Sequence, residues 1–198
     1  METEIILASA SPRRRELFNM IGLPFRTEVS GAEETLEEGM SPELFVEQLS
    51  LRKAAEVASR QKGDALVIGA DTVVVLDGEI LTKPRDCADA VQMLTRLSGR
   101  EHRVLTGVSV VRLRDGKAVS VCEETKVHFR ALSEEEILHY VQTGEPMDKA
   151  GAYGLQGRAS VMADRIEGDF FNVVGLPLCR LARVLRDEFD FNLILEVF

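Results

Sequence analysis

Strand-like and helix-like segments alternate along almost the whole chain, and this alternation limits the folds open to it. Short apolar runs predict strands near residues 5–8, 24–29, 65–70 and 193–197, and β-branched stretches predict a hairpin of residues 104–113 and 118–129. Helices are expected over residues 12–20, 41–63, 86–97, 133–144 and 178–189. Strands and helices that alternate around one long hairpin predict an α/β fold with a mixed sheet and flanking helices.

The first predicted strand runs directly into a helix with an unusual start. Ser11 has the chemistry of an N-cap, and Pro12 that of the first helical position. Arg13, Arg14 and Arg15 then occupy the first turn, where the helix dipole disfavours each exposed cation by about 0.3–1 kcal/mol. Hydroxyls, backbone N–H groups and guanidinium forks at a helix N-terminus suit phosphate oxygens. We therefore expect a bound anion here in preference to a solvated basic turn.

The 198-residue chain is acidic overall, with a formal net charge of −9. This charge disfavours a general surface for nucleic acid or for an anionic membrane, so the arginine cluster points to a small anionic ligand. The sequence has no signal-peptide pattern and no apolar run of membrane-spanning length. We therefore expect a cytoplasmic protein with no nucleic-acid or membrane partner.

The cysteines and histidines show no pattern of a metal or redox site. The three cysteines are widely spaced and form no C-x-x-C pair, so neither a disulfide framework nor a zinc site is indicated. His102, His128 and His139 have no histidine four residues away, and we expect surface or structural roles for them.

A single aspartate, Asp71, stands inside the apolar run of residues 66–76. Burying a carboxylate is costly unless a metal, a cation or hydrogen bonds compensate it. Gly69, two residues earlier, would let another backbone or a ligand approach closely. An aspartate held at a strand end by backbone N–H groups is an equally good interpretation. A haloacid-dehalogenase motif does not fit, because Val73 stands where that motif needs a second aspartate.

The glycine-rich segment of residues 148–157 is expected to be an irregular binding loop. Its glycines permit close backbone approach, and Gln156 offers a donor–acceptor pair that can read the edge of a base. A structural turn is the alternative. Asp77-Gly78 predicts a tight hairpin turn after Asp71. Lys83 follows this turn, and Lys53 lies on the second predicted helix. By itself, each of these lysines fits a solvated residue.

Several blocks, in order from about residue 5 to 185, resemble the Maf family of nucleoside triphosphate pyrophosphatases. They are LASASPRR (7–14), GADTVV (69–74), LTKP (81–84), LSG (97–99), GEP (144–146), DKAG (148–151) and NVVGLP (172–177). The resemblance implies a fold like that of the inosine triphosphate pyrophosphatases, a single domain over residues 1–198 with two lobes around a central cleft. It also implies house-cleaning of the nucleotide pool, by hydrolysis of a nucleoside triphosphate to the monophosphate and pyrophosphate.

By position, the resemblance implies a role for each residue that matches a family motif. Asp71 matches the proton acceptor of the reaction. The positions tied to substrate choice are Arg13, Thr72 and Gln156, and those that line the phosphate cleft are Ser9, Arg14, Lys53 and Lys83.

The resemblance also implies a divalent metal, held by Glu34 together with Asp71. Mg²⁺ or Mn²⁺ is expected, because these ions suit carboxylate and phosphate oxygens. Ser30-Gly31-Ala32-Glu33 stands where the family usually has an aspartate-rich approach, so Glu33 stays an alternative to Glu34. Whether Asp71 binds the metal, takes a proton from water, or does both is left open.

The segment AYGLQG (152–157) resembles the subfamily that acts on dTTP and UTP. A 7-methyl-GTP pyrophosphatase is the alternative within the enzyme class, although that subfamily carries a different loop with serine and glutamate at this position. A binding protein that regulates cell division, with incidental catalysis, is the alternative outside it, and net charge opposes a nucleic-acid-binding module. The expected partner is the nucleoside triphosphate, and a homodimer is left open.

Overall fold

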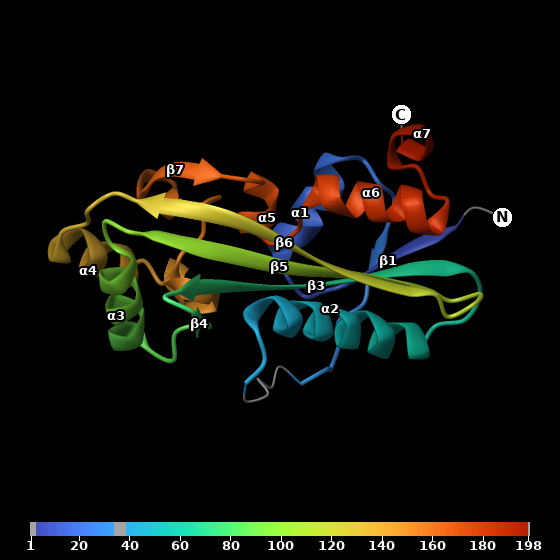
Figure 1. Cartoon of the computed structure of the whole chain (residues 1–198), viewed down its shortest axis with the longest axis horizontal. Helices are drawn as coiled ribbons and strands as arrows, with labels where there is room; N and C mark the ends of the chain where they lie inside the picture. The colour runs from blue at the N-terminus through green and yellow to red at the C-terminus, as the bar shows by residue number, and fades with distance from the viewer. Residues whose placement is uncertain (1–2, 34–38, 198) are drawn as a thin grey trace. The chain divides into compact units, whose positions relative to one another are not determined.

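The computed structural model describes residues 3–33 and 39–197 (Figure 1). Its strands are β1 (Glu4–Ala8), β2 (Arg26–Thr27), β3 (Ala65–Leu76), β4 (Glu79–Leu81), β5 (Glu101–Arg112), β6 (Ala118–Phe129) and β7 (Ala163–Glu167). Its helices are α1 (Pro12–Met20), α2 (Pro42–Ser59), α3 (Cys87–Leu97), α4 (Glu134–Gln142), α5 (Phe170–Val174), α6 (Leu178–Phe189) and α7 (Leu193–Val197). Three short 3₁₀ turns, η1 (Glu145–Asp148), η2 (Ala150–Ala152) and η3 (Arg158–Val161), lie between α4 and β7.

The strands form one mixed sheet, as the alternating sequence pattern predicts. Neighbouring strands follow the order β2-β1-β3-β5-β6-β7, and β4 pairs with β3. β1 pairs in parallel with both β2 and β3, whereas β3 with β4 and β6 with β7 are antiparallel. Among the described residues, no helix has the length and hydropathy needed to cross a membrane.

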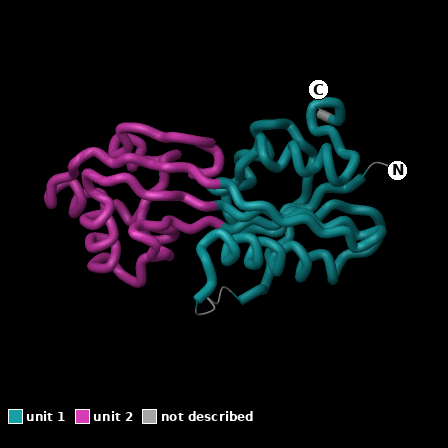
Figure 2. Tube along the Cα trace, viewed as in Figure 1, with its two compact units in different colours: residues 1–71, 106–123, 175–198 teal, residues 72–105, 124–174 magenta. Residues whose placement is uncertain are grey.

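The chain divides into two units, neither of which is a continuous segment (Figure 2). Unit 1 comprises residues 1–71, 106–123 and 175–198, and unit 2 comprises residues 72–105 and 124–174. β3, β5 and β6 each contribute residues to both units. The arrangement of two lobes around a cleft stays a prediction.

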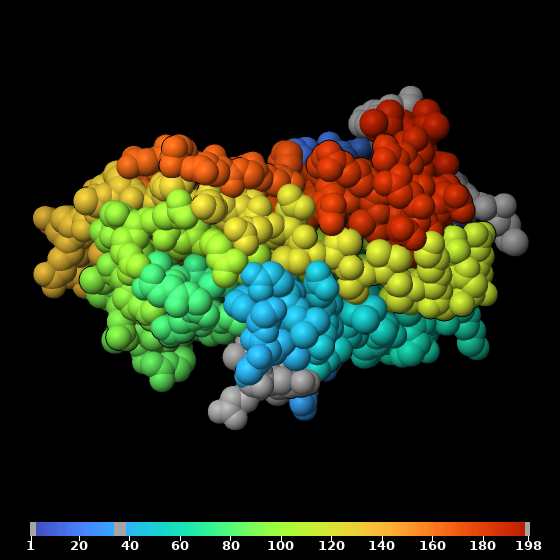
Figure 3. All heavy atoms as spheres, in the orientation of Figure 1, coloured from blue at the N-terminus to red at the C-terminus, as the bar shows by residue number. Residues whose placement is uncertain are grey.

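In unit 1, helices cover both faces of the strands. Figure 1 shows α2 on one face and α6 on the other. Ala54 and Val57 of α2 join Ile6, Val67 and Val111 in a buried apolar cluster. On the other face, α6 lies against the β5–β6 hairpin (Figure 3), where Lys117 Nζ is 2.9 Å from a carboxylate oxygen of Glu188.

Glycines bring α2 into backbone contact with the sheet. A Cβ on Gly69 of β3 would clash with the carbonyl oxygen of Ser50, and one on Gly107 of β5 with that of Val46. Since every other residue has a Cβ, only glycine at these positions lets the helix lie so close. This close approach fixes which α2 side chains face the end of β3.

Unit 2 has its own apolar core. Buried residues of α3 and α4, among them Leu94, Leu97 and Ile137, pack with side chains from the strands and from the segment between α4 and β7. The Tyr153 ring meets Phe129 edge-on at 4.7 Å between ring centroids. The glycine-rich segment is thus packed into this core and is not a detached loop.

Most predicted helix starts are confirmed. Oγ of Ser41 accepts a hydrogen bond from Leu44 N at 3.3 Å, and Asp86 Oδ1 accepts one from Asp89 N at 2.8 Å. Ser133 and Glu136 form the expected capping box. Ser11 occupies the N-cap position of α1, but its side chain makes no capping hydrogen bond.

The strand predicted over residues 193–197 is wrong, because this segment is the short helix α7. Asn192 starts it, since its Oδ1 accepts from Ile194 N at 3.1 Å and its carbonyl accepts from Leu195 N at 3.0 Å. Ile194 and Leu195 are mostly exposed, so the apolar run does not mark a buried strand. The strand predicted over 24–29 is shorter than expected, with only Arg26–Thr27 in the sheet, and the sequence analysis made no prediction for β7.

Candidate functional site

Asp71 is buried in β3 and forms an ion pair with Lys53 of α2. The lysine Nζ lies 2.7 Å from Asp71 Oδ1, and each side chain is 12% exposed. Gly69 explains the pairing, because residues two apart in a strand share a face, so Asp71 lies on the same face as the α2 contact. Lys53, three residues after Ser50, is then within reach of the carboxylate.

Ser9 and Arg14 form a second polar group in unit 1. Arg14 Nη1 donates to Ser9 Oγ at 3.3 Å, and its Nε donates to the carbonyl of Gly175 at 2.7 Å. Ser9 is almost fully buried, and its Oγ also accepts from Ser11 N at 3.2 Å. These contacts hold the Arg14 guanidinium at the start of α1.

The parallel pairing of β1 and β3 places these two groups at the same edge of the sheet. Ala8 of β1 is paired with Gly69 of β3. Ser9 is one residue beyond this pair, and Asp71 is two residues beyond it. Arg13 is half-buried at the start of α1, whereas Arg15 is exposed. Unit 1 therefore brings together cationic and hydroxyl groups where the parallel pairing of β1 with β3 ends. This is the carboxyl end of β1, a place where ligands of α/β folds commonly bind, whereas β3 continues to Leu76.

The remaining described candidates, Thr72, Lys83 and Gln156, lie in unit 2. Thr72 is half-buried and directly follows Asp71 in β3. Lys83 lines a hollow of about 310 Å³ together with Arg85 and Arg96. Each of these arginines has a carboxylate partner, Asp89 at 3.1 Å and Glu79 at 2.6 Å respectively.

The segment that carries Gln156 is held at both ends. On one side Tyr153 is buried against Phe129, and on the other the backbone N of Arg158 donates to Glu145 Oε1 at 3.1 Å. Glu145 Oε1 also accepts from the Tyr140 hydroxyl at 3.1 Å. Gln156 itself is exposed between these two anchors. Its amide is thus presented on a fixed backbone, as a base-reading group requires.

Burial sets the protonation of the groups beneath this segment. Burial, and after it the nearby His128, lower the pKa of His102 to about 4. Burial raises the pKa of Tyr153, so this phenol keeps its proton and can donate to the His102 Nε2 that lies 2.7 Å away. Burial also raises the pKa of Tyr140, and the neighbouring Glu145 carboxylate adds to this effect.

The residues of these two polar groups are candidates from the sequence, but the contacts that orient them could not be predicted from it. The Gly175 carbonyl, in the NVVGLP block, accepts a hydrogen bond from Arg14. Glu145 lies in the GEP block and braces the Gln156 segment. Glu34 is outside the described residues, and Glu33 is exposed.

The donor chemistry of the site fits an oxygen-binding metal. Asp71 supplies carboxylate oxygens, the ligand type that Mg²⁺ and Mn²⁺ prefer. Ser9 adds a hydroxyl at the same sheet edge. No cysteine or histidine lies among the candidates of unit 1, so the set offers no ligand that favours a softer ion.

The comparisons with known proteins agree along nearly the whole sequence. The family profile described as "Maf-like protein" matches residues 4–188. A dTTP/UTP pyrophosphatase of Symbiobacterium thermophilum is 54% identical over 182 residues, which cover 92% of each chain. A dTTP/UTP pyrophosphatase of Alkaliphilus oremlandii is 50% identical over 191 residues, which cover 96% of this chain and 99% of the relative.

Solved structures resemble the chain more distantly. A HAM1 protein from Coxiella burnetii has a TM-score of 0.48 and 14% identity, over 94% of this chain and all (100%) of that chain. A dITP/XTP pyrophosphatase from Mycobacterium abscessus has a TM-score of 0.42 and 16% identity, over 66% of this chain and 76% of that chain.

Proposed function

The chain belongs to the Maf family, and on this basis we propose that it hydrolyses dTTP and UTP to the nucleoside monophosphate and pyrophosphate. It is a hydrolase of nucleoside triphosphates. The relatives that share about half of its residues are named dTTP/UTP pyrophosphatases, and the match extends over more than nine-tenths of both chains.

The observation that carries the proposal is the pair of polar groups in unit 1, Ser9–Arg14 and Lys53–Asp71, which lie where the parallel pairing of β1 with β3 ends. A triphosphate repels an incoming hydroxide, because its oxygens are negatively charged. Fixed cations offset this charge as it shifts toward the pyrophosphate leaving group. Arg13, Arg14 and Lys53 of unit 1 are proposed to supply these cations, and Lys83 of unit 2 is proposed as a further phosphate-binding residue.

Asp71 acts on the attacking water. In this proposal its carboxylate takes the proton of the water or holds the metal that orients it, and Lys53 fixes the carboxylate in place through the 2.7 Å ion pair. A residue held this way loses little entropy when the substrate arrives, which favours catalysis.

A divalent metal, Mg²⁺ or Mn²⁺, belongs to the same proposal, with Asp71 and Glu34 as the residues that would hold it. When bound, such an ion neutralises phosphate charge and lowers the pKa of a coordinated water. The carboxylate oxygens of Asp71 support this assignment through their donor chemistry.

Gln156 is the proposed reader of the pyrimidine base. Its side-chain amide can pair with the donor and acceptor groups on the base edge, and it is exposed on a segment braced by Tyr153 and Glu145. Thr72 and Arg13 are proposed to contribute to the same choice of substrate.

The test is pyrophosphate release from a panel of nucleotides, measured with Mg²⁺ and with Mn²⁺ in turn. We expect dTTP and UTP to give the highest kcat/KM, and 7-methyl-GTP to be a poor substrate. A clear preference for 7-methyl-GTP would contradict the substrate assignment. No pyrophosphate from any triphosphate, with either metal, would contradict the proposed activity itself.

A further inference from the structure

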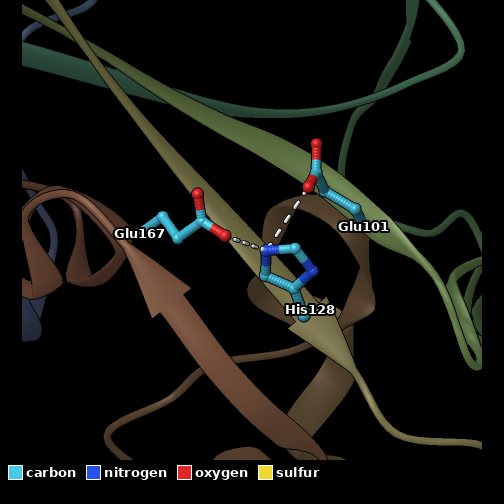
Figure 4. A group of neighbouring side chains, drawn as sticks. All are labelled: Glu101, His128 and Glu167. Carbon is cyan, nitrogen blue, oxygen red and sulfur yellow. Dashed lines mark hydrogen bonds and ion pairs between the residues drawn. The ribbon is translucent and has the colours of Figure 1, made fainter.

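Three side chains that could bind a metal, none of them assigned to the reaction, meet in unit 2. Glu101 comes from β5, His128 from β6 and Glu167 from β7. Both carboxylates point at the same ring nitrogen of the histidine (Figure 4). His128 Nε2 lies 2.9 Å from Glu167 Oε1 and 3.3 Å from Glu101 Oε2.

These separations suit a shared cation. Tetrahedral Zn²⁺ binds imidazole nitrogen and carboxylate oxygen at about 2.0–2.2 Å, which places its ligand atoms about 3.4 Å from one another. In the structure all three ligand atoms lie within 4.8 Å of one another. Little side-chain movement is therefore needed to bring the three groups onto one ion, and the fourth position would be open to water.

The hydrogen bonding around His128 gives an independent argument. Besides the two carboxylates, Arg165 Nη2 lies 3.2 Å from the same Nε2 atom. A ring nitrogen carries either a proton or a lone pair, so it can donate to a carboxylate or accept from the guanidinium, but it cannot do both. A cation removes this conflict, because it binds the lone pair and both carboxylates together.

The positive groups at this place can be displaced at low cost. Lys126 Nζ lies 3.2 Å from Glu101 Oε1, and Arg165 pairs with Glu167, but these two cationic side chains are 44% and 63% exposed. Exposed ion pairs contribute little to stability, typically about 0–1 kcal/mol. Both side chains can turn toward solvent when a divalent ion binds.

We propose that Glu101, His128 and Glu167 form a binding site for a divalent transition metal of the Zn²⁺ class. The imidazole ligand favours Zn²⁺ or Co²⁺ over Mg²⁺, which prefers six oxygen ligands. The site therefore takes a different ion from the proposed reaction, and it links three neighbouring strands of unit 2. It is a structural site, and it stands whether or not the proposed activity does.

The experiment uses the full chain after removal of metals with EDTA. Zn²⁺ binding is measured by titration calorimetry and by the shift in melting temperature, and Co²⁺ serves as a spectroscopic probe of coordination. We expect one tightly bound Zn²⁺ per chain, a higher melting temperature and a tetrahedral Co²⁺ spectrum, with no such shift from Mg²⁺.

Variants separate this site from others. His128→Gln and Glu167→Gln are expected to weaken Zn²⁺ binding about tenfold or more. His139→Gln is the matched control, because His139 is exposed on α4 and its Nδ1 lies 3.1 Å from the carbonyl of Glu135. Arg165→Gln is expected to tighten binding, because it removes a competing cation.

Equal Zn²⁺ affinity in the wild-type chain and in both ligand variants would overturn the proposal. So would an octahedral Co²⁺ spectrum that His128→Gln leaves unchanged. The His128→Gln variant should release pyrophosphate with Mg²⁺ at the same rate as the wild-type chain. A failure of the proposed activity would therefore be distinguishable from a failure of the proposed Zn²⁺ site. Circular dichroism of each variant checks that loss of binding is not loss of folding.

Discussion

At the scale of single residues, the environment of Asp71 shows what the sequence could predict and what it could not. An aspartate inside an apolar run is visible in the sequence, which left a metal, a cation or hydrogen bonds open as its compensation. The structure shows a cation, Lys53, beside it. Lys53 by itself looked like a solvated lysine. Which residue it pairs with depends on where α2 crosses β3. The close packing at Gly69 sets this crossing point, and no local sequence pattern predicts it.

Asp71→Asn is expected to keep the fold and lose most turnover, by a factor of about 10²–10⁴, because the amide cannot take a proton or replace a carboxylate on a metal. Steady-state pyrophosphate release and circular dichroism check this. Asp77→Asn is the matched control, because Asp77 is exposed in the turn after β3 and asparagine tolerates its positive φ of 54°. A folded Asp71→Asn protein with near-normal turnover would rule out this role.

Gln156→Glu is expected to change the ranking of nucleotides and to leave the stability of the fold nearly unchanged. A carboxylate only accepts hydrogen bonds at neutral pH, so one of the two contacts to a pyrimidine edge is lost. The kcat/KM values for dTTP, UTP and 7-methyl-GTP measure the effect. Gln142→Glu, on the exposed end of α4, controls for the added charge, and an unchanged ranking would show that Gln156 does not read the base.

At the scale of elements, local signals predicted the helices better than the short strands. Ser41, Asp86 and Ser133 cap their helices through contacts within four residues, so their effect is readable from the sequence. α7 was mistaken for a strand because a short apolar run fits either structure, and burial decides between them. β7 is largely exposed and rich in charged residues, so its sequence lacks the apolar pattern that would have predicted a strand paired with β6.

The contact between α2 and β3 gives a prediction for Gly69→Ala. The added methyl would clash with the carbonyl of Ser50 and lie 2.9 Å from Ala54 N, so backbone must move. We expect the free energy of unfolding to fall by about 3 kcal/mol, together with a loss of turnover as the Lys53–Asp71 pair is disturbed.

Urea denaturation measures this change. Gly31→Ala is the control, because within the described parts of the chain its Cβ would have no neighbour within 4 Å, and its φ is not positive. It should alter stability by less than about 0.5 kcal/mol. Equal stability of the two variants would mean that α2 lies further from β3 than described.

At the scale of the whole molecule, the mixed sheet was predictable because strands, helices and one hairpin alternate in the sequence. No pattern in the sequence predicted where the two units divide. The boundaries between them fall inside β3, β5 and β6, where the apolar pattern continues without a break. Composition shifts and linkers mark domain boundaries only when the chain leaves a domain through a loop.

The pH dependence of stability is a property of the molecule that His102 helps to set. Its pKa is about 4 in the folded state and 6.5 ordinarily, so between these values the unfolded chain binds more protons. The contribution of His102 to the free energy of unfolding is therefore fully present above pH 6.5. It is lost as the pH falls toward 4, which lowers the free energy of unfolding by about 3 kcal/mol.

Urea midpoints at pH 7, 5.5 and 4.5 measure this fall. His102→Gln, which does not titrate, should lose less stability over the same range, although it starts from a lower value because the hydrogen bond with Tyr153 is altered. Parallel pH profiles for the two proteins would assign the acid sensitivity to other groups.

The division of the chain has a consequence for the order in which it can fold during synthesis. Residues 1–71 begin unit 1, but its last segment, residues 175–198, is made after all of unit 2. Unit 2 has all of its residues once position 174 has left the ribosome. The unit that starts first is thus completed last, and a nascent chain that stops before residue 174 carries neither unit whole.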